Sequence, residues 1–73
     1  GGDDMSFQLR EAILQNVSNH TPEQLEATIQ DAVESGEEKM LPGLGVLFEV
    51  FWQHANDSDK DKVVQEISSG LQA

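Results

Sequence analysis

The sequence of 73 residues contains no cysteine, which excludes disulfides, thiolate metal sites and thiol catalysis. Because small secreted domains usually depend on such crosslinks, their absence favours a reducing environment inside the cell. No stretch approaches the roughly 20 apolar residues that a membrane-spanning helix needs, and the N-terminus lacks the basic and apolar regions of a signal peptide. We therefore expect one soluble domain with the modest stability that this length allows.

Basic residues are also scarce. The chain has only Arg10, Lys39, Lys60 and Lys62 against 14 acidic residues, so its formal net charge is −10. Nucleic-acid affinity comes largely from neutralising phosphates with Lys and Arg, and anionic membrane surfaces attract the same residues. The charge therefore predicts no nucleic-acid partner and no membrane partner, while a protein partner, particularly a basic one, stays open.

The first four residues differ in character from the rest of the chain. Residues 1–4 precede Met5 and read Gly-Gly-Asp-Asp, so we expect them to be a remnant placed before a natural start. The single helical domain is then expected to cover residues 5–73. Leaving out Asp3 and Asp4 changes the net charge from −10 to −8, so the acidity belongs to the domain itself.

Apolar residues recur at three-four spacing, and no segment shows the alternation of a strand. This pattern predicts helices over residues 6–17, 22–35, 42–55 and 59–69. The expected caps and stops are Ser6, Thr21 with Pro22 and Gln24, Gly36, Asp57 or Ser58, and Gly70. The fold class is therefore all-α, a small, compact four-helix bundle-like domain with a central apolar third helix.

The two strongest apolar stripes lie on the second and third predicted helices. We expect six of their side chains to be largely buried, namely Leu25, Ile29, Val33, Leu47, Phe48 and Phe51. Truncating Phe48 to Ala should then cost about 3–5 kcal/mol, the range for large aromatic deletions in cores.

The third helix has a second apolar side, formed by Val46 and Val50 next to the polar Gln53. Either the other three helices cover both sides, or these residues form an interaction surface for a protein partner or a second copy. Gly43 and Gly45 each lower helix propensity by on the order of 1 kcal/mol relative to Ala. We therefore expect another helix to pack closely against the bare backbone there, with an anion bound at the helix N-terminus as the weaker alternative.

No group of residues carries a convincing chemical motif. Asp57, Asp59 and Asp61 resemble the start of a calcium-binding loop, but the glycine and the final glutamate of such a loop are missing, so an acidic helix start is favoured. His20 and His54 lie in no metal-ligand spacing and are expected to be exposed spectators. We predict no catalytic residue, cofactor, metal or small-molecule ligand, and the chain is not expected to be an enzyme.

One long run carries a family resemblance. Residues 35–50 read Ser-Gly-Glu-Glu-Lys-Met-Leu-Pro-Gly-Leu-Gly-Val-Leu-Phe-Glu-Val, and Trp-Gln-His-Ala follows at 52–55. With Leu-Arg at 9–10, Asn-Val at 16–17, Glu-Gln-Leu-Glu at 23–26 and Thr-Ile at 28–29, the chain resembles the small acid-soluble spore protein I family of Bacillus-type endospore formers.

The resemblance implies synthesis in the developing forespore and deposition in the spore core, an intracellular location, with no catalytic residue to carry over. The α/β-type spore proteins, which share the class name and coat spore DNA, have a different sequence pattern, and the acidic charge opposes DNA coating. A passive, non-enzymatic spore-core protein is the first expectation. A protein-interaction module that uses the third helix to bind a partner or to homodimerise is the second, and a regulator that binds a small molecule or metal is a distant third.

Overall fold

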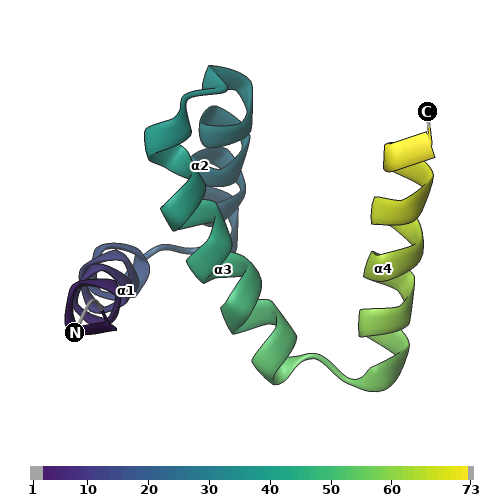
Figure 1. Ribbon diagram of the computed structural model, residues 1–73, viewed down its shortest axis with the longest axis horizontal. Coiled ribbons are helices and arrows are strands. Elements are labelled where there is room, and N and C mark those ends of the chain that lie inside the picture. The colour runs from purple at the N-terminus through teal and green to yellow at the C-terminus, as the bar shows by residue number, and fades with distance from the viewer. Residues whose placement is uncertain (1–2, 73) are drawn as a thin grey trace.

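The computed structural model describes residues 3–72, with side chains from residue 8 onward, and is drawn in Figure 1. The described residues contain four α-helices, one 3-10 turn and no strand. In chain order the elements are α1 (Asp3–Val17), α2 (Pro22–Ser35), η1 (Glu38–Met40), α3 (Leu41–His54) and α4 (Asp57–Gln72). The predicted all-α fold class with four helices is confirmed.

The α2 helix begins and ends where its sequence signals place it. The backbone N–H of Gln24 donates to Thr21 Oγ1 over 3.2 Å, and the Gln24 side chain accepts from the Thr21 N–H over 3.0 Å. This reciprocal pair satisfies two N–H groups that have no partner inside the helix. At the other end, Gly36 takes the left-handed conformation, with φ of 64°, and stops the helix. The predicted capping box and glycine stop are confirmed.

The α3 helix starts one residue earlier than expected. A proline disfavours the helical conformation at the residue before it, but Leu41 has φ of −60° and ψ of −43°. The 3-10 turn η1 runs directly into α3, so Leu41 is already held in a helical backbone when the chain reaches Pro42. The proline sits in the first turn, where its missing N–H has no intrahelical partner to lose.

The ends of α1 and α4 also differ from the prediction. Ser6 lies inside α1 instead of capping it. At the start of α4 the cap is Asn56, neither Asp57 nor Ser58, because the Asn56 side-chain oxygen accepts from the Asp59 N–H over 2.8 Å. The α4 helix then runs to Gln72 through Gly70, which was expected to stop it.

The continuation of α4 has a physical reason. A left-handed glycine stop is favoured when the residue after it packs back onto the helix. Leu71 is 82% exposed and makes no such contact. Residues 3–4 belong to α1, so the helix does not start at Met5, although the expected boundary between a remnant and the domain remains a prediction.

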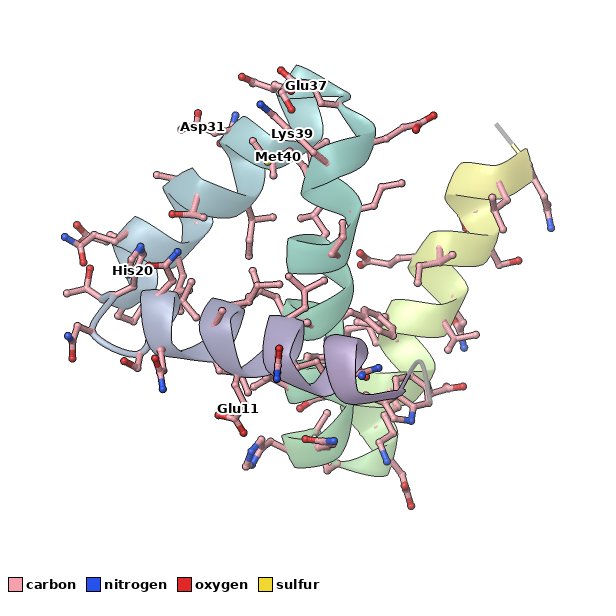
Figure 2. All side chains as sticks on the ribbon, turned by 60° about the vertical axis from the view of Figure 1, so that its left-hand side comes forward. Glu11, His20, Asp31, Glu37, Lys39 and Met40 are labelled. Carbon is pink, nitrogen blue, oxygen red and sulfur yellow. The ribbon has the colours of Figure 1, made fainter. Side chains whose placement is uncertain are left out.

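The third helix is central, as predicted. The α1 and α2 helices and the η1 turn all contact α3. Figure 1 shows α4 on the other side of α3, joined to it by a short bend and running back in the opposite direction. The two helices diverge from this bend, and Figure 2 shows the same separation from another side. The α3 helix is therefore shared between a packed region and a more open one.

The divergence limits what the fold buries. Among the described side chains the buried apolar one is Val46, which is 6% exposed. The prediction of a largely buried core is wrong for Ile29, Val33 and Phe48, which are exposed, Val33 to 62%. The other three predicted core residues, Leu25, Leu47 and Phe51, are half-buried. The helical periodicity was predicted correctly, but periodicity does not say how closely the partner helices approach.

The expected close approach at the two glycines of α3 is also wrong. A Cβ atom built on Gly43 or on Gly45 would meet no atom of another element within 4 Å. The described helices therefore leave room for a side chain at both positions. Among the described residues, tight packing does not offset the helix-propensity cost of these two glycines.

Candidate interaction surface

The three residues predicted to form an interaction surface fall in different environments. Val46 is buried, Val50 is half-buried and Gln53 is exposed. Val46 shares a small hollow with Leu9 and Arg10 of α1, so at Val46 the first of the two alternatives holds and α1 covers this part of α3. These three residues therefore do not form one exposed apolar patch.

An ion pair holds α1 on this side of α3. Arg10 Nε donates to Glu49 Oε1 over 2.8 Å and approaches Oε2 at 3.3 Å. The hydrogen bond lowers the pKa of the Glu49 carboxyl and raises the pKa of the Arg10 guanidinium, and the opposite charges add to both effects. The residues are 39 positions apart, so no local spacing in the sequence could have indicated this pair.

The opposite side of α3 carries an exposed apolar surface, which it shares with α4. We call it the α3–α4 face and define it by Phe48 and Trp52 of α3 and by Val64 and Ile67 of α4. All four side chains are exposed, Phe48 to 43%, and Ile67 to 48%. A hollow of about 390 Å³ lies between α3 and α4. Three of the four face residues line it, Phe48, Trp52 and Val64, together with Glu49 and Gln53. Gln53 is thus the one predicted surface residue that lies at this face.

Aromatic contacts order the α3 half of the face. The Phe48 and Trp52 rings are stacked, with centroids 5.7 Å apart and an interplanar angle of 27°. Phe51 lies 6.1 Å from Phe48 in a tilted arrangement. From α4, Lys60 places its Nζ atom 5.3 Å from the Trp52 ring centroid, a cation–π contact that links the two helices close to the bend. The rings are held in place although they remain open to solvent.

The α4 half of the face is a stripe with no carboxylate from Lys60 to Leu71, although Asp57 lies on the same side in the first turn. Lys60, Val64, Ile67 and Leu71 follow at spacings of four, three and four residues, which places them on one side of a helix. The same rotation places Asp59, Asp61 and Glu66 away from the centre of the stripe. From the sequence, Phe48 was predicted to be buried in a core, and no partner was predicted for this stripe. Its amphipathic spacing was the signal that could have identified the face.

A second hollow lies among α1, α2 and α3. It has a volume of about 440 Å³, and its lining is mostly apolar, with Asn16, Asp31 and Lys39 as the ionic or amide members. Figure 2 shows Asp31 and Lys39 near Met40, where α2 approaches η1. Lys39 pairs with its neighbour Glu37 over 3.1 Å, and Asp31 is exposed to solvent. The polar groups do not converge on one point, so this hollow offers no defined recognition geometry.

The remaining titratable candidates are dispersed. His20 is half-buried between α1 and α2 instead of exposed, whereas His54 is exposed in the last turn of α3. Asp57 and Asp59 lie in the first turn of α4, as favoured over a calcium-binding loop. Over residues 8–72, whose side chains the structure describes, no group of three or more His, Asp or Glu side chains is placed to hold a metal ion. In the same part of the chain, no helix has both the length and the apolar character to cross a membrane.

Comparison with known proteins identifies a family match over most of the chain. Residues 7–71 match the family described as small, acid-soluble spore protein I. A protein of that name from Shouchella clausii is 63% identical over 67 residues, 92% of this chain and 97% of the relative. Relatives of the same name from Halalkalibacterium halodurans and Bacillus subtilis are 56% and 57% identical, and the matches cover 100% and 94% of their lengths. No solved structure matches the chain.

Proposed function

Because the chain belongs to the small, acid-soluble spore protein I family, we propose that it is a non-enzymatic protein deposited in the spore core during sporulation, where it acts through protein contacts. The names of the relatives support the spore setting. The observation that carries the contact function is the α3–α4 face, on which large apolar side chains from two helices lie open to solvent.

The α3–α4 face differs from the scattered apolar residues found on any protein surface. Phe48, Trp52 and Val64 line one hollow, and Ile67 extends the surface by one turn along α4. Contiguous apolar surface of this kind is characteristic of interaction sites, and burial of apolar area is favourable by about 25 cal/mol per Å². This feature favours a contact function over the role of passive, packed cargo in the spore core.

Duplex DNA is not part of the proposed function. Of the four basic residues, Arg10 pairs with Glu49, Lys39 pairs with Glu37, and Lys60 lies over Trp52. These engagements, with a net charge of −10, leave little capacity for phosphate neutralisation. A mobility-shift titration at physiological salt should therefore detect no complex. A tight complex that weakens steeply with added salt would revive DNA coating.

Crosslinking in intact spores tests the contact function. Spores would carry the wild-type chain or a variant with Val64→Asp and Ile67→Asp, which places two charges on the α3–α4 face. The matched control, Gln65→Asp with Ser69→Asp, adds the same charges to another side of α4 that also borders solvent. Wild type and control should give the same discrete crosslinked species, and the face variant should lose it. If the wild type, the face variant and the control all crosslink only to abundant spore proteins in proportion to their amounts, the contact function would be contradicted.

The location is tested separately from the contacts. After the outer spore layers are removed, the protein should remain in the core fraction. Release of the protein only when the core is lysed during germination would also support a location in the core. Recovery with the stripped outer layers would contradict the proposed location.

A further inference from the structure

The chain exposes more surface than a closed domain of its size. Its solvent-accessible surface is 6092 Å², whereas a compact monomer of 8.0 kDa exposes about 4,500 Å². Its Cα radius of gyration is 13.6 Å, whereas a compact chain of 73 residues has about 11 Å. The excess surface, roughly 1,600 Å² by the same relation, accompanies the divergence of α4 from α3 in Figure 1.

This excess is large enough for a stable dimer. A standard protein–protein interface buries about 800 Å² on each partner, and homodimer interfaces often bury more. An interface of standard size on the α3–α4 face would therefore cover about half of this excess. A chain this short, without cysteine for disulfides, commonly gains its stability from association.

The two helices have the dimensions to pair with themselves. The α3 helix has 14 residues and α4 has 16, so their lengths are about 21 and 24 Å. They run in opposite directions from a short bend at Ala55 and Asn56, and each carries its apolar stripe on the face. Two such pairs related by a twofold axis would form a four-helix bundle of α3 and α4 from both copies.

The charge of the face distinguishes a second copy from a basic partner. A surface that recognises a basic protein would present carboxylates, but the α4 stripe contains none between Lys60 and Leu71. The carboxylate of Glu49 at the edge of the hollow is already paired with Arg10. Beyond the first turn of α4 the face is thus apolar, with Asp57 and Lys60 at its closed end, and it fits a partner surface that is also apolar.

We propose that the occupant of the α3–α4 face is a second copy of this chain, in a twofold dimer in which α4 of each copy packs between α3 and α4 of the other. The inference rests on the proposed contact function and names its partner. Antiparallel α4 helices bring Lys60 of each copy toward the C-terminal end of the other copy's α4, where a cation is favoured. Outside the face, two chains of net charge −10 repel each other, and salt screens that repulsion.

Sedimentation equilibrium of the full chain at several concentrations and two salt concentrations tests the dimer. The expected result is a particle of twice the chain mass whose association strengthens with added salt, because apolar contact must overcome charge repulsion. A complex with a basic partner would weaken under the same change. A chain that stays monomeric at millimolar concentration in high salt would overturn the inference.

The same two variants locate the interface. Val64→Asp with Ile67→Asp should weaken the dimer by about 100-fold or more, since each charge would be buried without a partner. Gln65→Asp with Ser69→Asp should weaken the dimer only slightly, through the added charge repulsion between the two copies. Circular dichroism should show the same helix content for both variants, because all four positions are exposed in the single chain. Equal loss of association in both variants would overturn the assignment to this face.

The single tryptophan gives a second readout. Trp52, the only one in the chain, is 39% exposed and lies on the face. Its fluorescence should shift to shorter wavelength with increasing concentration of the wild type and of the control variant, and it should stay constant for the face variant. If the chain is monomeric but forms a discrete crosslink to a different protein in spores, the dimer inference fails and the proposed contact function stands. If neither is observed, both fail.

Discussion

The two sides of α3 differ in how well they are covered: one side packs against α1, and the other remains exposed to solvent. On the α1 side, Val46 is buried and the exposed Arg10–Glu49 ion pair links α1 to α3. On the α4 side, larger apolar residues, Phe48 and Trp52, remain exposed although they carry more apolar area. The helix that could cover them is present, but it diverges from the bend (Figure 1). Apolar content alone therefore does not decide which side of a helix becomes core.

The largest expected effect comes from a charge placed on the side of α3 that α1 covers. Val46→Asp should abolish cooperative folding, because an unpaired carboxylate in place of the buried side chain costs several kcal/mol in a domain of limited stability. Circular dichroism with thermal melting measures this loss. The matched change on the open side, Val64→Asp, should keep helix content and melting cooperativity in the single chain. Equal unfolding of both variants would show that the two sides do not differ.

Phe48→Ala should have an intermediate effect. The sequence alone predicted about 3–5 kcal/mol for a buried phenylalanine, but Phe48 is 43% exposed in the single chain. At concentrations where the chain is monomeric, we expect a loss of about 1–2 kcal/mol in urea denaturation, in proportion to the area that is buried. The loss should grow with protein concentration if the face is covered by a second copy. A loss above 3 kcal/mol in dilute solution would indicate that the face is closed within one chain.

Gly43→Ala should stabilise the chain. A Cβ at this position meets no atom of another element within 4 Å, and alanine improves helix propensity by up to about 1 kcal/mol. The melting temperature should therefore rise by a few degrees. Gly36→Ala is the informative control, because Gly36 has φ of 64° and an alanine there is strained. A destabilised Gly43→Ala variant would show that α1 or α2 approaches α3 more closely than the structure indicates.

The smallest effect should come from the exposed ion pair. The folded chain lowers the pKa of Glu49 below its ordinary value of 4.5, so the pair contributes stability above that value and loses it as the pH falls through the lowered pKa. Glu49→Gln should lower the melting temperature slightly near neutral pH, because exposed ion pairs contribute little. The difference from the wild type should shrink in acid. A difference that is independent of pH would mean that the charge of Glu49 is not involved.

Features that depend on a few neighbouring residues were predicted well. The capping box of Thr21 and Gln24 and the left-handed Gly36 place α2 at the predicted residues, because each signal acts through hydrogen bonds within one turn. The end of α4 was predicted wrongly because a glycine stop also needs a packing contact, and Leu71 does not supply one. The cap of α4 moved to Asn56, which is equally suited to accept a backbone hydrogen bond.

The sequence by itself determined the helices, the acidic surface and the apolar character of α3, since propensity, capping and charge are local properties. Only the tertiary structure decided that α1 covers Val46, that Glu49 pairs with a residue 39 positions away, and that Phe48 and Trp52 remain open beside α4. These outcomes depend on the angles at which helices cross and on the bend after α3. Helix crossing angles depend on the summed fit of many weak contacts, which no local spacing records.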